Sequence, residues 1–248
     1  MKTNIKLLAL FTMGLLLFSC SQEELNKEIE TTLTPDYSLS KRGNTSTLTN
    51  WSFDNLTGWE DATQVGNPNY YIENGHLNIF TNPNTWERTK IKTTTTYSTG
   101  TYTWRIFVPA IGEGDMASIG AFLYNNDTHE LDFEIGYGKQ IIRNELNAAT
   151  DDLLVYMTSQ ANPFQSYATK IKRNQWHTFS MELTLNSSRK YQVNWRINDI
   201  LASTVQLSYG SKTKFKIFCS LENLTFIGEH IPKTQNYALF DFVEYNNK

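Results

Sequence analysis

The 248-residue chain is 40% hydrophobic and 19% charged, which indicates one compact domain plus a tail and excludes collagen-like and coiled-coil proteins. Its 22 Lys and Arg against 25 Asp and Glu give a formal net charge of −3, so the composition does not favour a nucleic-acid partner. Aromatic residues make up 13% of the chain and are mixed with many Thr, Asn and Ser, a composition that favours pleated sheets.

Residues 1–19 are interpreted as a lipoprotein signal peptide. Lys2 and Lys6 precede an apolar run over residues 7–18 that is too short for a stable membrane-spanning helix. Cys20 follows directly and resembles the cysteine that becomes the lipidated N-terminus of bacterial lipoproteins; ordinary secretion with an incidental cysteine is the alternative. The acidic stretch after Cys20 resembles the signal that sends lipoproteins of Bacteroidetes-type bacteria to the cell surface. We therefore expect a surface-exposed protein, anchored to the outer membrane through this lipid alone.

Residues 20–48 are interpreted as a flexible tether. They are rich in Glu, Lys, Thr, Ser and Asn and show no sustained apolar period, so they cannot bury enough surface to offset the entropy of ordering. A short amphipathic helix over residues 23–29 is the alternative. The folded domain is expected to span residues 49–248.

From Trp51 onward, apolar residues alternate in segment after segment, which is typical of antiparallel strands with one buried face. In residues 102–108 and 191–197 this alternation places Trp104 and Trp195 in the core rather than on a sugar-binding surface. No stretch of ten or more residues shows a helical period after the signal. The sequence therefore predicts an all-β fold, a two-sheet antiparallel β-sandwich of the jelly-roll type.

Residues 129–136 carry the clearest chemical signal. Period 2 sends Leu131, Phe133 and Ile135 to the core and Glu130, Asp132 and Glu134 to the other face. A row of like charges is a local cost on a strand, so this row calls for a chemical explanation. Retaining glycosidases use two carboxyl groups about 5 to 5.5 Å apart, one ionised and one protonated, and a third acid between them can share protons with both.

The segment Glu-Leu-Asp-Phe-Glu over residues 130–134 resembles the Glu-x-Asp-x-Glu active-site strand of glycoside hydrolase family 16. Without an inserted residue, it is most similar to the straight strand of licheninases and xyloglucan enzymes. Further similarity lies in residues 100–109 and 119–123, in residues 176–179 and 191–199, and in residues 238–245. The resemblance therefore extends over about residues 51–248. It implies a concanavalin A-like jelly roll with a concave cleft, and an endo-acting β-glucanase or galactanase that cleaves a β-linked polysaccharide with retention through a covalent glycosyl-enzyme intermediate.

The resemblance also implies a role for each acid: Glu130 as nucleophile, Asp132 as assisting acid and Glu134 as general acid/base. It allows a structural calcium near Asp241, for which an ordinary polar residue on a strand is the alternative; no cofactor is required. The family usually carries a Trp-bearing, Asn-rich segment before the final strands, and residues 219–226 contain no Trp.

Substrate contacts are expected on the acid-bearing side of neighbouring strands, because a sugar-binding face should be polar or aromatic. Reading residues 142–148 as a strand, the alternation gives these candidates: Phe122, Tyr124, Arg143, Glu145, Asn147 and Glu222. For each of them a solvated strand face is the alternative.

Other chemistries find little support in the sequence. His76, His129, His177 and His230 are scattered without the spacing of a zinc site, so no metal site is predicted. The two cysteines do not suggest a disulfide framework, and Cys219 reads as a small buried hydrophobe. A non-catalytic carbohydrate-binding sandwich on the cell surface is the competing hypothesis, and an adhesion protein is a third; neither accounts for the intact acid row. The protein is expected to be a monomer.

Overall fold

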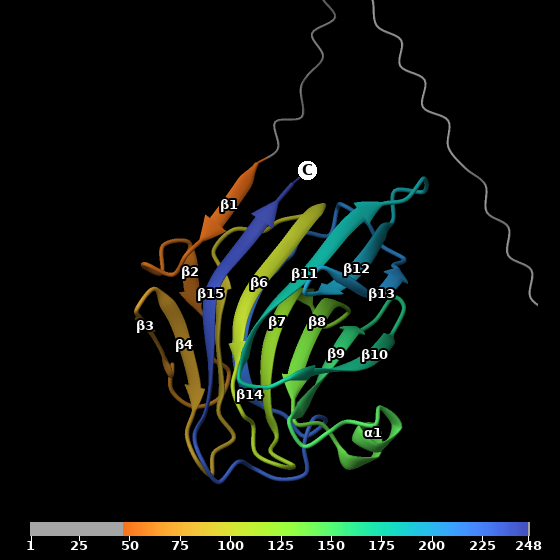
Figure 1. Cartoon of the computed structure of the whole chain (residues 1–248). Helices are drawn as coiled ribbons and strands as arrows, with labels where there is room; N and C mark the ends of the chain where they lie inside the picture. Colours follow the sequence, from red (N-terminus) through yellow and green to blue (C-terminus); the bar gives the residue numbers. More distant parts are fainter. Residues whose placement is uncertain (1–46, 248) are drawn as a thin grey trace, which may run out of the picture. The chain divides into compact units, whose positions relative to one another are not determined.

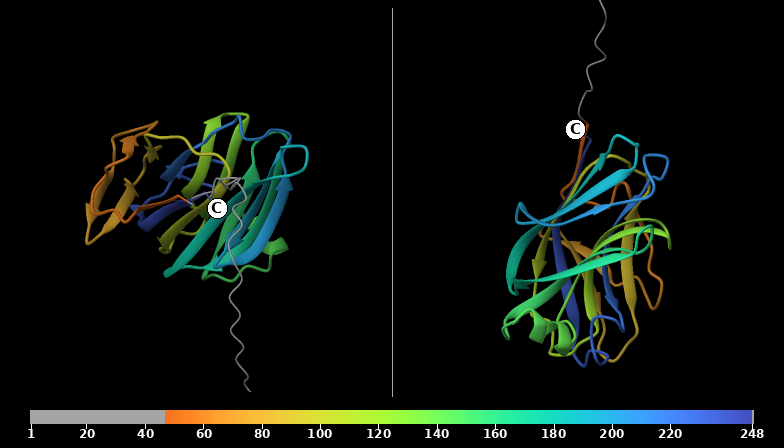
Figure 2. Two further views of the ribbon diagram at one scale, coloured as in Figure 1. Left: turned by 90° about the horizontal axis from the view of Figure 1, so that it is seen from above. Right: turned by 90° about the vertical axis from the view of Figure 1, so that its right-hand side faces the viewer.

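The computed structural model describes residues 47–247, which form two antiparallel sheets packed face to face (Figure 1). The all-β sandwich expected from the alternating sequence is therefore confirmed. Figure 2 shows the two layers of strands from two further directions. The buried hydrophobic side chains form one cluster to which strands of both sheets contribute. In this part of the chain no helix is long and apolar enough to cross a membrane.

Sheet A is eight-stranded in the described residues and runs in the order β13-β12-β11-β6-β15-β4-β3, with β1 also paired to β15. Its strands are β1 (Leu48–Trp51), β3 (Tyr70–Glu73), β4 (His76–Thr81), β6 (Gly100–Val108), β11 (Gln175–Leu185), β12 (Tyr191–Ile197), β13 (Ile200–Gln206) and β15 (Asn236–Asn246).

Sheet B is seven-stranded in the described residues and runs in the order β10-β9-β8-β7-β14-β5-β2. Its strands are β2 (Trp59–Asp61), β5 (Arg88–Thr93), β7 (Ala117–Asn126), β8 (His129–Gly136), β9 (Asp152–Ser159), β10 (Gln165–Lys172) and β14 (Lys216–Asn223). Strand β8 contains the acid row and lies near the middle of this sheet, where neighbours on both sides fix its register.

Tight turns set the register of the hairpins. Asn74 and Gly75 connect β3 to β4, and both have positive φ angles, 52° and 74°. The two-residue hairpin turn that matches strand twist requires positive φ at both positions, which Asn and Gly adopt at little cost. This turn fixes which residues of β4 face the core: Leu77 and Ile79 are fully buried, and their neighbours face outward.

The core tryptophans connect the two sheets. Trp104 on β6 and Trp195 on β12 are fully buried, which confirms their assignment to the core. The Trp104 indole donates a hydrogen bond of 3.0 Å to the backbone carbonyl of Phe218, and that of Trp195 donates one of 3.1 Å to the backbone carbonyl of Asp132. Because a buried N–H needs an acceptor, these bonds tie sheet A to two strands that form the acid-bearing face of sheet B.

One segment differs from the sequence-based prediction. Residues 142–148 were expected to form a strand, but Gln140–Glu145 form a short helix, α1, which lies beyond the ends of β8 and β9 (Figure 1). The strand interpretation is therefore wrong. Apolar residues at positions 142 and 146 fit a helical spacing of four as well as an even strand spacing, so period alone does not separate the two for so short a segment.

Candidate active site

Strand β8 presents its three acids on the outer face of sheet B. Its pairing with β7 is regular from Glu130 to Gly136, and its pairing with β9 is regular from Leu131 to Gly136, so no bulge interrupts the acid row. Leu131, Phe133 and Ile135 are fully buried in the core. Since neighbours along a strand point to opposite sides, the acids face away from the core together.

Asp132, the central acid, is 1% exposed. Its Oδ2 accepts a hydrogen bond of 2.7 Å from Gln160 Nε2, whereas its buried Oδ1 has no partner among the described residues. Burial, followed by the charges of Glu130 and Glu134, raises the pKa of Asp132 well above its usual value. A protonated Asp132 can satisfy this oxygen by donating a hydrogen bond to Glu130, the acid whose side chain it contacts.

The two outer acids differ in their environments. Burial raises the pKa of Glu130 to about 7, and Lys90 opposes this increase. Burial, followed by the charge of Glu222, raises the pKa of Glu134 to about 8, even though Ser118 Oγ donates a hydrogen bond to Glu134 Oε2. Both pKa values thus lie above the ordinary value of a glutamate, and that of Glu130 is the lower, which is the order that a carboxylate beside a carboxylic acid requires.

Aromatic side chains lie beside the acids on the same face. Phe122 is opposite Asp132 and Tyr124 is opposite Glu130, as expected from the alternation. The Phe122 ring stacks on Phe218 of β14 with centroids 4.5 Å apart and an interplanar angle of 15°. The Tyr124 hydroxyl donates a hydrogen bond of 2.8 Å to Asp127, which raises the tyrosine pKa to about 12.

A hollow of about 460 Å³ opens next to Glu130. Strand β7 supplies Phe122 and Tyr124 to its wall, and β5 supplies Arg88, Lys90 and Lys92. Its further lining residues are Asp61, Ala62, Thr63, Gln64, Asp127 and Phe218. Aromatic and hydrogen-bonding side chains around a carboxyl group are what a sugar-binding subsite requires.

Glu222 lies on the acid-bearing face as predicted, but it is not an open substrate contact. It is 2% exposed, and its Oε2 accepts hydrogen bonds from Arg88 Nε at 2.6 Å and from Lys90 Nζ at 2.8 Å. The prediction of a direct sugar contact is therefore corrected: this carboxylate already has two cationic partners and little contact with solvent.

Arg143, Glu145 and Asn147 were predicted to contact substrate from a strand beside the acids. They lie instead on and just after the short helix α1. Arg143 is 3% exposed, and its guanidinium donates hydrogen bonds to three backbone carbonyls, those of Tyr137, Ala149 and Asp152. It fixes the loop around α1 and is not available to a sugar. Glu145 and Asn147 are exposed at the helix end, with Asn147 at a φ of 48°, so their prediction as cleft residues is also corrected.

Several residues of the site were missed from the sequence. Gln160 follows the end of β9 and reaches Asp132, while Tyr156 of β9 is opposite Glu134 and packs edge-on against Phe226. Lys90 comes from β5, which is two strands away from the acid strand's partner β7. Alternation along β9 and β5 indicates that Tyr156 and Lys90 each lie on the polar side of their own strand. It does not indicate which strands are neighbours, so it could not bring these residues together with the acids.

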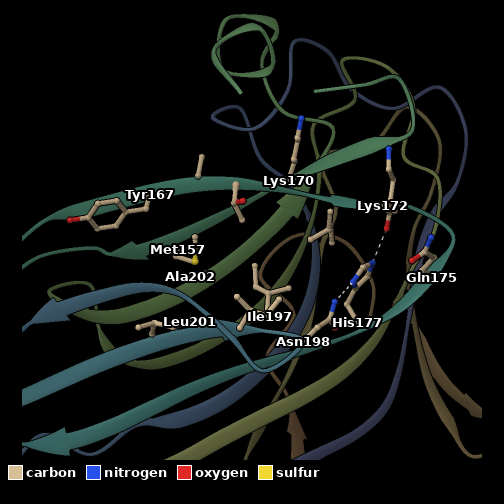
Figure 3. Close-up of a pocket in the computed structure, with 14 residues that line it drawn as sticks. Met157, Tyr167, Lys170, Lys172, Gln175, His177, Ile197, Asn198, Leu201 and Ala202 are labelled. Carbon is tan, nitrogen blue, oxygen red and sulfur yellow. Dashed lines mark hydrogen bonds between the residues drawn. The ribbon is translucent and has the colours of Figure 1, made fainter. Parts of the chain in front are cut away.

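A larger hollow, of about 630 Å³, lies at the open edge of the sandwich between β10 and β13 (Figure 3). His177 lines it and is neutral, since its Nε2 donates to the Lys172 carbonyl at 2.8 Å, its Nδ1 accepts from Asn198 at 3.1 Å, and burial lowers its pKa. None of the described residues lining this hollow is Asp or Glu. We therefore assign the acid chemistry to the smaller hollow beside Glu130.

The surroundings of Asp241 do not suit calcium. Arg105 Nε lies 3.6 Å from Asp241 Oδ2, and His76 Nδ1 lies 3.4 Å from Oδ1. Within residues 47–247 no three His, Cys, Asp or Glu side chains gather as metal ligands would. A carboxylate that faces a guanidinium and an imidazole is already paired, so the hypothesis of a calcium at this position is corrected.

Comparison with solved structures identifies the same fold in carbohydrate-active enzymes. The Bacillus licheniformis β-glucanase superposes with a TM-score of 0.57 at 18% identity, covering 80% of this chain and 97% of that enzyme. The laminarinase catalytic domain from Thermotoga maritima gives a TM-score of 0.57 at 12% identity, with coverages of 82% and 98%. LamA from Z. galactanivorans, solved with laminaritriose and laminaritetraose, gives 0.56 at 11% identity, with coverages of 82% and 99%.

Sequence comparisons add no closer relationship. No family model matches the sequence, and no curated protein matches it. The fold that the resemblance implies is thus confirmed: this chain has the same two-sheet sandwich as these β-glucanase and laminarinase structures.

Proposed function

We propose that this protein is a retaining glycoside hydrolase that cleaves a β-linked polysaccharide. The observation that carries the proposal is the row Glu130, Asp132 and Glu134 on one strand face, with the three carboxyls in three different environments. Retention requires one ionised and one protonated carboxyl, and the order of the two glutamate pKa values, with that of Glu130 the lower, supports this assignment of roles.

In the first step, Glu134 donates its proton to the glycosidic oxygen while the Glu130 carboxylate attacks the anomeric carbon. The bond from that carbon to the leaving oxygen breaks, and an ester bond to Glu130 forms. In the second step, Glu134, now ionised, takes a proton from a water molecule, which attacks the same carbon and releases Glu130 as carboxylate. Two inversions give net retention.

Asp132 is suited to assist the nucleophile. It lies between the two glutamates, and as an acid it can donate a hydrogen bond from Oδ1 toward Glu130 while Gln160 holds its other oxygen. This bond stabilises the Glu130 carboxylate before it attacks. It stabilises the same carboxylate again when the glycosyl ester breaks in the second step. The bond from Trp195 to the Asp132 backbone fixes the strand at that point.

The solved structures of the same fold supply the first substrates to test. Their names include β-1,3-1,4-glucanase and laminarinase, and one is bound to laminaritriose and laminaritetraose. We propose a neutral β-linked glucan or galactan as the substrate class. The aromatic residues Phe122, Tyr124 and Phe218 beside the acids support a pyranose-binding cleft.

We also propose that the enzyme is a surface-exposed lipoprotein of the outer membrane. This proposal depends on Cys20 and on the apolar run before it, all of which lie outside the described residues. Cys20→Ser should leave the protein unlipidated and release it from the membrane fraction. If the variant still fractionates with membranes as the wild type does, the anchor proposal is wrong.

The hydrolase proposal is tested by incubating residues 47–248, which include all of β1, with a panel of β-linked polysaccharides and counting new reducing ends. Laminarin, mixed-linkage β-1,3-1,4-glucan, agarose and xyloglucan form the panel. We expect new ends from at least one member, and none from the same member with Glu130→Gln. Binding to a polysaccharide without cleavage by the wild type would instead favour a carbohydrate-binding sandwich.

A further inference from the structure

A buried ion pair lies on the acid-bearing face of sheet B, away from the acid row itself. Glu222 Oε2 accepts hydrogen bonds from both Arg88 and Lys90, at 2.6 and 2.8 Å. Glu222 is 2% exposed and Lys90 is 5% exposed. Taking both charges out of water is costly, and an apolar pair of similar size is often at least as stable, so stability alone is a weak reason for this arrangement.

The sheet places this pair within reach of the acids. Lys90, Ser220, Gly120 and Glu134 are consecutive partners across β5, β14, β7 and β8. Between the lysine and the glutamate lie one serine and one glycine, and a Cβ on Gly120 would come within 3.4 Å of Glu134 Oε1. Glu222 is opposite Ser118 of β7, and the Ser118 hydroxyl donates a hydrogen bond to Glu134, so the Glu222 carboxylate lies beside the immediate hydrogen-bond partner of Glu134.

Lys90 also approaches Glu130. Both residues line the 460 Å³ hollow. Lys90 Nζ lies 5.7 Å from the centroid of the Phe122 ring, and Phe122 is paired with Asp132 across β7 and β8. Glu222 holds the same ammonium at 2.8 Å. The lysine is therefore fixed by a buried carboxylate at the wall of the hollow that Glu130 also lines.

We propose that Lys90 and Glu222 are positioning residues for the two glutamates: the ammonium keeps Glu130 ionised, and the Glu222 carboxylate keeps Glu134 protonated. This inference rests on the proposed function, in which Glu130 is the nucleophile and Glu134 the proton donor. Glu222 thus acts through charge rather than through contact with the sugar. It belongs to the segment 219–226, where the family resemblance would lead one to expect a tryptophan.

The pKa values agree with this division of roles. For Glu130, the Lys90 charge is the largest influence after burial, and it lowers the pKa. For Glu134, the Glu222 charge is the largest influence after burial, and it raises the pKa. Glu222 also raises the pKa of Glu130, and Lys90 also lowers that of Glu134, but each of these opposing effects is smaller than the one just named for the same glutamate.

Other titratable groups share this face and enter the same titration. They are Glu60 and Asp61 on β2, Arg88 and Lys92 on β5, Tyr124 on β7, Asp127 in the following turn, Asp132 on β8, Tyr156 on β9 and Lys216 on β14. Lys216 is the matched control. It is in the row of Glu130 and Tyr124, but its ammonium pairs with the exposed Glu60 at 2.8 Å.

The test is a carboxyl NMR titration of the free protein, with ¹³Cδ-labelled glutamate and signals assigned by substitution. Lys90→Met should raise the midpoint of Glu130 by about one pH unit, and Glu222→Gln should lower that of Glu134 by a similar amount. Lys90→Arg should restore the Glu130 midpoint, and Lys216→Met should move neither. This readout needs no substrate, so it does not depend on whether the protein cleaves a glycoside.

With a cleaved substrate, the same variants are examined by the pH profile of kcat/KM. The acid limb reports ionisation of Glu130, and the basic limb reports loss of the Glu134 proton. Lys90→Met should move chiefly the acid limb to higher pH, and Glu222→Gln chiefly the basic limb to lower pH. If Lys90→Met does not fold, Glu222→Gln decides alone. Unchanged midpoints in the folded variants, or shifts of equal size in Lys216→Met, would overturn the inference.

Discussion

Asp132 and Asp241 lie on the outer faces of the two sheets, and their surroundings have little in common. Asp241 on sheet A is partly exposed and faces Arg105 and His76. Asp132 on sheet B is 1% exposed, lies between two glutamates, and has one oxygen without a partner within residues 47–247. The same side chain is thus a paired surface carboxylate in one place and a buried acid in the other, because burial and neighbouring charges decide its protonation.

The outer faces of sheets A and B also differ in how firmly their acidic residues are held. On sheet B the core tryptophan Trp195 binds the backbone of the acid strand, and Gln160 holds the Asp132 side chain. On sheet A the partners of Asp241 are the partly exposed Arg105 and His76. Charge pairs near the surface contribute little to stability. Substitutions should therefore have large effects on activity on one face and small effects on the other.

The largest effect is expected for Glu130→Ala. Without the carboxylate no glycosyl ester can form, so kcat should fall on the order of 10⁴-fold or more on every cleaved substrate. Azide can enter the vacated space and attack the anomeric carbon, giving partial rescue with a product of inverted configuration. The rates are measured by reducing-end release and the product by NMR. Wild-type activity in this variant would refute the assignment of the nucleophile.

Glu134→Gln should have the next largest effect, and its size should depend on the substrate. Natural polysaccharides need a proton on the leaving oxygen, so the glycosylation step should slow by about 10²- to 10⁴-fold. Aryl glycosides with good leaving groups need less help and should lose less in that step. The two substrate types are compared in pre-steady-state assays. Azide rescue with inverted product here and not in Glu130→Ala would mean that the two roles are reversed.

Asp132→Asn should reduce kcat by about 10²-fold with little change in folding, since it replaces an assisting acid by an amide of the same shape. The variant keeps an acceptor for Gln160 but cannot share a proton with Glu130. Kinetics and thermal unfolding are measured side by side. A loss of unfolding temperature without a loss of kcat would make Asp132 a structural residue.

The smallest effect is expected for Asp241→Asn, the counterpart on the other sheet. Its ion pairs with His76 and Arg105 are partly exposed, so the free energy of unfolding should change by no more than about 0.5 kcal/mol. Activity should not change, and added calcium should not raise the unfolding temperature. A calcium-dependent increase that Asp241→Asn removes would contradict our account of this face.

The acid face could be predicted from the sequence because period 2 is unambiguous in residues 129–136. The same alternation placed Trp104 and Trp195 in the core, where they are fully buried. The segment around Arg143 could not be predicted this way, because its apolar spacing fits both a strand and a helix. Its long side chain could equally contact a sugar or, as the structure shows, three backbone carbonyls.

The ion pair could not be predicted for a different reason. Lys90 and Glu222 are separated by 132 positions in the chain, and their contact depends on β5 pairing with β14. Alternation tells which face of its own strand a residue occupies but not which strand lies beside it. Glu222 was therefore placed on the correct face and given the wrong partner.

The central claim is that Glu130 and Glu134 act together with net retention. The most direct measurement is ¹H NMR of the anomeric signals during early cleavage of a β-linked substrate, before the released sugar mutarotates. Our account predicts that the first product is the β-anomer and that the α-anomer appears later. An α-anomer as the first product would contradict the covalent mechanism and the role given to Glu130.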